Sequence, residues 1–175
     1  MKNMNCLKPE KVDPIHLFVT GGSGAGKSHL VKAIYQTAVK TFRHGTINPD
    51  KPIVALMAPA GVTAININGT TIHTALSILK ESGDFVLPMF DQDRTQLRLT
   101  LSELKIIRVG EISMAADTTL LHLHQRLKEI FNIPNSELFA PISFIAVGDL
   151  CQLPPIRRRA MFKNYKTYMS PIECI

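Results

Sequence analysis

Eight consecutive residues near the start of the chain constrain its fold more than any other feature. The segment Gly21-Gly22-Ser23-Gly24-Ala25-Gly26-Lys27-Ser28 fits the pattern G-x-x-x-x-G-K-S/T without a gap. A loop that wraps phosphates must point several backbone N–H groups inward, and glycine reaches the required backbone angles at little cost. The glycines followed by Lys-Ser therefore predict a phosphate-binding loop for ATP or GTP, and not an ordinary glycine-rich turn.

The residues on either side of this loop have the periodicity that such a loop requires. Residues 15–19 form a short apolar run that predicts a buried strand. From Lys27 onward apolar residues recur at helical spacing, and Gly45 lies beyond the expected end of the helix. The residues expected to face the core are Leu30, Val31, Ile34 and Ala38. In this arrangement Lys27 reaches the β- and γ-phosphates, and the Ser28 hydroxyl is a ligand for Mg²⁺.

The rest of the chain alternates between strand and helix patterns. Continuous apolar runs predict further strands at residues 53–57, 106–109 and 142–147. A short helix is expected over residues 72–79. A longer one follows Asp117, which can cap it, and carries an apolar stripe of Leu120, Leu123, Leu127 and Ile130. The alternation predicts an α/β fold, with a parallel sheet that has helices on both faces.

Two segments lack a clear helical or strand period. Residues 59–71 are rich in Gly, Thr and Asn and are expected to form a loop that can offer donors to phosphates. Residues 80–100 are the least readable part of the chain. His122 and His124 are two residues apart on the expected helix, so they point to different faces and are not expected to form a metal site.

Charge and cysteine content bound the possible partners and the compartment. Twenty Lys and Arg against fourteen Asp and Glu give a net charge of +6. A basic surplus favours polyanionic partners, although it can also serve solubility alone. Cys6, Cys151 and Cys174 are too few and too widely spaced for a disulfide framework or a zinc site, which favours a reducing compartment. No apolar run has the length of a signal peptide or a membrane helix, so neither secretion nor membrane insertion is expected.

Three further segments carry a resemblance to a known family. They are residues 58–73 (A-P-A-G-V-T-A-I-N-I-N-G-T-T-I-H), 110–114 (G-E-I-S-M) and 147–155 (V-G-D-L-C-Q-L-P-P). Together with the phosphate-binding loop, in this order and spacing, they resemble superfamily one DNA helicases of the Pif-one and RecD branch. The versions carried by rolling-circle, Helitron-type transposons look most similar. The G-D-x-x-Q-L-P-P segment is the most specific part.

This resemblance implies a RecA-like P-loop NTPase domain. It assigns residues 15–156 to the first of two motor domains, after an irregular lead-in (residues 1–14) and before a basic tail (residues 157–175). In the family ATP lies between the two domains, single-stranded DNA crosses both, and hydrolysis drives 5′-to-3′ movement. Because the chain stops at Ile175, we expect the second RecA-like domain and its arginine finger to be missing. The family acts in DNA repair, recombination, telomere maintenance and transposon replication.

The resemblance also assigns roles to single residues. Glu111 would polarise the attacking water, and Gln152 would sense the γ-phosphate from a loop that Asp149 supports. The whole loop holds the nucleotide: Gly21, Gly22, Ser23, Gly24, Ala25, Gly26, Lys27 and Ser28. The segment along the DNA backbone contains Pro59, Gly61, Thr63 and Ala64.

The sequence departs from the family at three positions. The family has an Asp that holds Mg²⁺ through water immediately before the catalytic Glu, and here that position is Gly110. Arg108 replaces an apolar residue in the preceding strand, where a charge is costly unless it finds a partner. Ala60 stands where the family usually has Thr, which removes one possible donor to DNA.

Three functions therefore compete. The first is an ATP-dependent DNA helicase motor domain. The second is a catalytically impaired nucleotide- and DNA-binding remnant, favoured by Gly110 and by the chain end. A small-molecule kinase is disfavoured because residues 148–155 have no role there. The basic group of Arg157, Arg158, Arg159, Lys163 and Lys166 can track phosphates, act as a nuclear-import signal or form a solvated face. We expect a nuclear protein.

Overall fold

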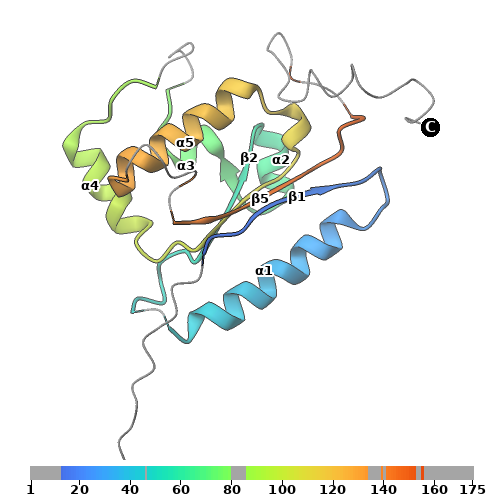
Figure 1. Ribbon diagram of the computed structural model, residues 1–175, viewed down its shortest axis with the longest axis horizontal. Helices are drawn as coiled ribbons and strands as arrows, with labels where there is room; N and C mark the ends of the chain where they lie inside the picture. The colour runs from blue at the N-terminus through green and yellow to red at the C-terminus, as the bar shows by residue number, and fades with distance from the viewer. Residues whose placement is uncertain are drawn as a thin grey trace, which may run out of the picture.

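Five parallel strands form one sheet at the centre of the molecule (Figure 1). The computed structural model describes residues 13–45, 47–79, 86–133, 139, 141–152 and 155. The strands are β1 (His16–Thr20), β2 (Val54–Ala58), β3 (Thr70–Thr71), β4 (Ile106–Val109) and β5 (Ser143–Gly148). Their order is β1-β5-β4-β2-β3, so β4 is the middle strand and β1 lies at one edge. All pairs are parallel, as predicted.

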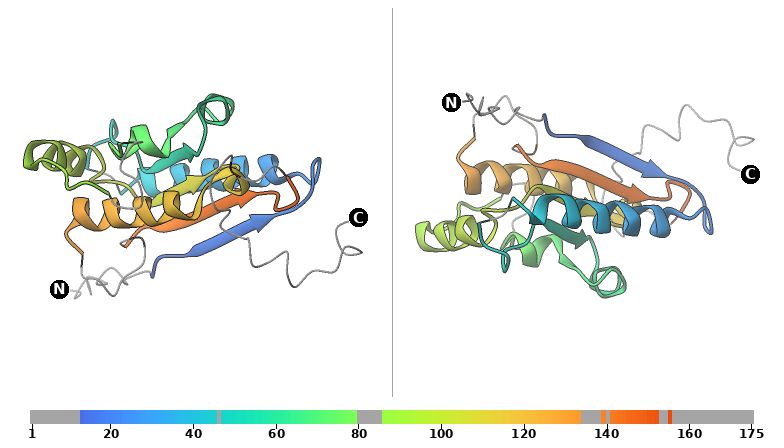
Figure 2. Two further views of the ribbon diagram at one scale, coloured as in Figure 1. Left: turned by 90° about the horizontal axis from the view of Figure 1, so that it is seen from above. Right: turned by 90° about the horizontal axis from the view of Figure 1, so that it is seen from below.

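Helices cover both faces of the sheet, which confirms the predicted layering. The long helix α1 (Lys27–Arg43) covers one face (Figures 1 and 2). On the other face lie α3 (Ile72–Ala75), α4 (Asp91–Thr100) and α5 (Asp117–Phe131). Two short helices follow strands directly: α2 (Gly61–Asn66) comes after β2, and the 3₁₀ helix η1 (Ile112–Met114) comes after β4.

The two faces bury very different amounts of apolar side chain. The larger cluster lies between the sheet and α5 and contains sixteen buried residues, among them Ile107, Val109, Leu123 and Leu127. The smaller cluster under α1 contains three buried residues, Val31, Ile145 and Val147. Burial of apolar area is the main stabilising term in folding, so the α5 side carries most of the stability of the sheet.

Most predicted elements agree with the structure to within one or two residues, and the differences have simple causes. Leu30 was expected to face the core and is 50% exposed, whereas Val31 and Ala38 are buried. The loop predicted over residues 59–71 is wrong, because it contains α2 and β3. With only Ala64 buried, α2 presents no apolar stripe to detect. Asp117 is the first residue of α5 and not its cap; Ala116 takes that position.

Several predictions fall on residues that the structure does not describe. These are most of the lead-in, Cys6, Cys174 and the basic tail from Arg157 onward. Within the described residues, no helix has both the length and the apolar content needed to cross a membrane.

Candidate nucleotide-binding site

The predicted phosphate-binding loop joins the end of β1 to the start of α1. Gly24 and Gly26 have φ angles of +77° and +81°, in the left-handed region where a side chain is disfavoured. Gly26 is the residue immediately before α1, so the loop ends on the free N–H groups of a seventeen-residue helix. This end of the helix carries partial positive charge and favours an anion such as phosphate.

Lys27 folds back over this loop. Its ammonium group donates hydrogen bonds to the carbonyl oxygens of Gly21 at 2.5 Å and Gly22 at 2.8 Å. The side chain is half-buried. A positive charge held at the mouth of the loop adds to the helix-terminal field, so both favour an anion at the same place.

An open cleft of about 410 Å³ lies at the carboxyl ends of the strands, where an α/β sheet places its ligands. Residues from four separate chain segments line it. They are Lys27, Ser28, Thr63, Asn66, Ile67, Arg108, Gly110, Glu111, Met114, Val147 and Gln152. The structure therefore brings Lys27, Ser28, Glu111 and Gln152 together in one cleft.

Glu111 has a backbone conformation that a side chain rarely adopts. Its φ and ψ are both 49°, in the left-handed region, directly between β4 and η1. A non-glycine residue in this region costs about 1–2 kcal/mol, and such strain concentrates at functional sites. Glu111 lines the cleft with Lys27 and Ser28.

A close contact fixes β5 against η1 beside Glu111. A Cβ on Gly148 would lie 2.8 Å from Ile112 Cγ2 and 3.1 Å from the Ile112 nitrogen. Only glycine allows this approach. This contact between Gly148 and Ile112 holds the segment that contains Gln152 next to the segment that contains Glu111.

Asp149 organises the turn that carries Gln152. It is 7% exposed, and its Oδ1 accepts a hydrogen bond from the Cys151 N–H at 3.0 Å. The Gln152 N–H donates to the Asp149 carbonyl at 3.1 Å. Asp149 thus supports the loop from behind, and Gln152 itself is exposed and lines the cleft.

Arg108 and Gly110 make the cleft unusual. The Gly110 N–H donates to the Met57 carbonyl at 2.9 Å, which extends the β2–β4 pairing to the edge of the cleft. Arg108 lies on β4 between Leu56 and Ile145, and its Nε is buried without a hydrogen-bond partner among the described residues. Burial lowers the pKa of this guanidinium group, and the nearby Glu111 carboxylate partly opposes that shift.

The cleft suits a magnesium ion that arrives with a nucleotide better than one held by the protein alone. Among the described residues no group of three or more His, Cys, Asp or Glu side chains could hold a metal ion. Mg²⁺ that binds with a nucleotide usually keeps several waters and takes one or two protein ligands in addition to the phosphates. The Ser28 hydroxyl, at the start of α1 beside the loop, meets this smaller requirement.

The segment assigned to DNA lies after β2, next to the cleft. Gly61 and Thr63 lie in α2, and Pro59 precedes it. Ala64 is buried, and its N–H and carbonyl already form hydrogen bonds with Ala60 and Gly69, so Ala64 offers no donor to DNA. Two apolar side chains of this helix, Val62 and Ile65, are each 75% exposed. Thr63 lines the nucleotide cleft, so α2 has one side toward that cleft and another toward solvent.

Sequence reasoning missed several residues of the cleft. Asn66, Ile67 and Met114 line it from α2 and η1, elements that residue periodicity does not reveal. Arg108 had a signal, because it is a charge within an apolar strand run.

Comparison with known proteins gives the same assignment along most of the chain. The family model described as PIF1-like helicase matches residues 9–170. The protein named ATP-dependent DNA helicase PIF1 from Candida albicans is 29% identical over 146 residues, which are 83% of this chain and 15% of that protein. ATP-dependent DNA helicase PIF5 from Trypanosoma brucei brucei is 33% identical over 82% of this chain and 14% of its own length. The chain therefore spans only a small part of these relatives.

Solved structures share the fold. The crystal structure of Pif1 helicase from Candida albicans superposes with a TM-score of 0.66 at 26% identity, covering 85% of this chain and 32% of that one. A Bacteroides Pif1 helicase in complex with ADP-AlF3 and ssDNA gives a TM-score of 0.63 at 25% identity, covering 90% of this chain and 34% of that one. On the sequence match and the shared fold together, the chain belongs to the PIF1-like helicase family.

Proposed function

We propose that this chain is the nucleotide-binding motor domain of an ATP-dependent DNA helicase. One observation carries the proposal: Lys27, Ser28, Glu111 and Gln152, from three distant parts of the sequence, line one cleft. That cleft lies at the end of a phosphate-binding loop with two left-handed glycines. The relatives named above are DNA helicases, and one neighbouring structure holds a nucleotide analogue together with ssDNA.

Each side chain has a distinct task in this proposal. The loop N–H groups and the Lys27 ammonium hold the β- and γ-phosphates. Glu111 orients the attacking water, and Gln152 responds to the γ-phosphate. A bound Mg²⁺, contacted by Ser28, would neutralise charge on the phosphate oxygens.

Single-stranded DNA is the proposed polymer partner. The net charge of +6 favours a polyanion, and α2 offers N–H groups and the Thr63 hydroxyl without any base-reading pattern. Thr63 also lines the nucleotide cleft, so DNA on α2 and a nucleotide at Lys27 would contact the same helix. Nuclear localisation and roles in repair, recombination or telomere maintenance belong to this proposal too.

A second function is favoured by one specific observation. Gly110 provides no carboxylate, so the chain would bind nucleotide and DNA with little turnover. DNA-stimulated ATP hydrolysis by the chain supports the motor function. ATP and DNA binding without any stimulated hydrolysis supports the impaired one.

The binding step common to both functions is tested with Lys27→Ala. Removing the ammonium group is expected to weaken ATP binding by roughly 2–4 kcal/mol, the scale for losing one partner of a desolvated charge pair. Isothermal titration calorimetry measures this directly. Lys32→Ala, an exposed lysine on the same helix, is the matched control and should bind like the wild type. Equal affinity of wild type and Lys27→Ala would refute the proposed site.

A further inference from the structure

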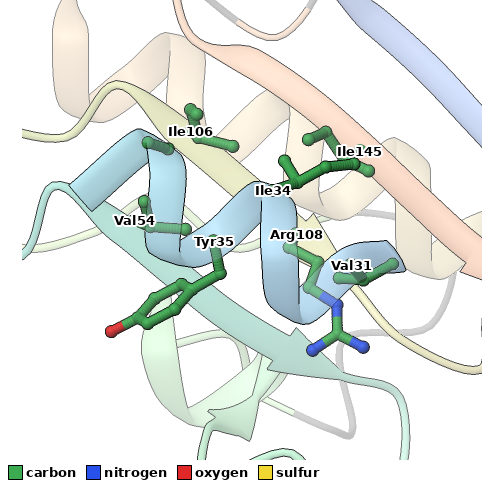
Figure 3. Close-up of a pocket in the computed structure, with 8 residues that line it drawn as sticks. Val31, Ile34, Tyr35, Val54, Ile106, Arg108 and Ile145 are labelled. Carbon is green, nitrogen blue, oxygen red and sulfur yellow. The ribbon is translucent and has the colours of Figure 1, made fainter. Parts of the chain in front are cut away.

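Arg108 lies within a central strand of the sheet, where a charged side chain is costly unless it reaches a partner or solvent. It lies in the middle strand of the sheet, on the face covered by α1. The aliphatic part of its side chain lines an apolar pocket with Val31, Ile34 and Ile145 (Figure 3). Long cationic side chains bury their methylene groups in this way only when the charged end reaches a polar region.

The charged end reaches the nucleotide cleft. In Figure 3 the side chain leads away from Ile106 and ends in a guanidinium group near Val31. Arg108 lines the nucleotide cleft together with Lys27, Ser28 and Glu111. Its Nη2 atom is 3.8 Å from the position that a Cβ on Gly110 would take, so the cation lies beside the missing side chain.

Arg108 and Gly110 both make the cleft more positive than the family pattern would, because that pattern has an apolar residue and an Asp at these two positions. A carboxylate at position 110 would repel a free triphosphate and attract a metal ion, whereas a guanidinium group attracts the triphosphate directly. Among the described residues, those with a charge that line the cleft are Lys27, Arg108 and Glu111, so the cations there outnumber the carboxylates. A planar guanidinium group with several N–H donors is also well suited to phosphate oxygens.

We propose that Arg108 is a phosphate ligand that lets this cleft hold a nucleoside triphosphate without a divalent cation. The inference rests on the proposed ATP site and adds that its affinity depends little on Mg²⁺. Gly110 is part of the same device, because it leaves space for the guanidinium group and removes the competing carboxylate.

The test is ATP affinity of the 175-residue chain in excess Mg²⁺ and in excess EDTA, by calorimetry. Wild type is expected to lose less than about threefold in affinity when Mg²⁺ is removed. Arg108→Leu, which suits the apolar pocket, should lose at least about tenfold in EDTA and less in Mg²⁺. Arg108→Lys keeps the charge and should retain more of the EDTA affinity than Arg108→Leu.

The outcomes separate this inference from the proposed function. No ATP binding by wild type in either buffer refutes the ATP site and the inference together. Binding in Mg²⁺ that disappears in EDTA, or an Arg108→Leu protein with unchanged EDTA affinity, overturns the inference and leaves the ATP site standing. If Arg108→Leu does not fold, Gly110→Asp decides, because a Cβ there meets no atom closer than 3.7 Å. Gly110→Asp should make binding at least about tenfold more dependent on Mg²⁺, and an unchanged dependence overturns the inference.

Discussion

At the scale of single residues, Glu111 sets stability against function. Its left-handed conformation destabilises the folded state, and glycine at this position would avoid that cost. Its carboxylate is proposed to orient water. We expect the free energy of unfolding of Glu111→Gly to equal that of the wild type or to exceed it by up to about 1 kcal/mol. We also expect this variant to lose ATP hydrolysis. Chemical denaturation and a phosphate-release assay measure the two quantities.

The matched control for that variant is Asn132→Gly, at another left-handed position at the end of α5 and away from the cleft. It should show the same small change in stability with unchanged hydrolysis. A Glu111→Gly protein that hydrolyses ATP at the wild-type rate would remove Glu111 from the catalytic role.

His124 makes the stability of the fold depend on pH. Its Nδ1 accepts a hydrogen bond from the Phe139 N–H at 3.1 Å, which requires the neutral ring at that nitrogen. Burial lowers the pKa of His124 below its usual 6.5, and Lys128 lowers it further. The unfolded chain therefore takes up the proton first as pH falls, so this residue makes the folded state less stable below about pH 6.5.

We expect the free energy of unfolding to fall between pH 7.5 and pH 5.5, and to fall less steeply in His124→Gln, which carries no titratable group there. Urea denaturation at several pH values measures both slopes. Equal slopes in the two proteins would show that His124 does not carry this pH dependence.

At the scale of elements, the contact between β5 and η1 positions the two sides of the cleft. Gly148→Ala would place a methyl group within 2.8 Å of Ile112 Cγ2 and against its backbone nitrogen. We expect a loss of about 1–3 kcal/mol in stability, the usual cost of overpacking, and weaker ATP binding because Glu111 and Gln152 flank the contact. Thermal unfolding and calorimetry measure these effects.

Gly61→Ala is the matched control for Gly148→Ala. A Cβ at Gly61 meets nothing within 4 Å, and alanine favours the helix that begins there. Its stability should stay within about 0.5 kcal/mol of wild type. If both alanine variants behave alike, the close approach at Gly148 does not restrain the strand.

The elements also show how far the sequence alone reaches. Continuous apolar runs identified the strands that carry the site, and the stripe of Leu120, Leu123, Leu127 and Ile130 identified α5. Helix α4 was not predicted because none of its residues is buried, so its sequence has no apolar periodicity. The loop motif predicted the end of β1 and the start of α1 because its glycines are chemically required. The left-handed turn at Glu111 arises from contacts between distant segments, which periodicity does not encode.

At the scale of the whole molecule, the unequal layers on the two faces of the sheet make folding stability uneven. Of the seventeen residues of α1 only Val31 and Ala38 are buried, whereas five residues of α5 are. Segments with few buried apolar contacts open locally at a lower free energy than the global unfolding. Helix α1 should therefore detach in brief sub-global openings while β4 and β5 stay paired under α5.

Because of this uneven stability, nucleotide binding should stabilise α1 against local opening. Lys27 and Ser28 begin α1, so a ligand held by them binds only the closed form of that helix. With ATP at about 100 times its dissociation constant, linkage adds about 2.7 kcal/mol to each opening that breaks the site. Hydrogen exchange of α1 amides in the wild type should then slow by about 100-fold. In Lys27→Ala, which is expected to bind ATP weakly, the same ATP concentration should slow these amides much less. Each cycle of nucleotide binding and release would thereby stabilise and destabilise α1 on one face of the sheet. The frequency of its local openings would then depend on whether the cleft is occupied.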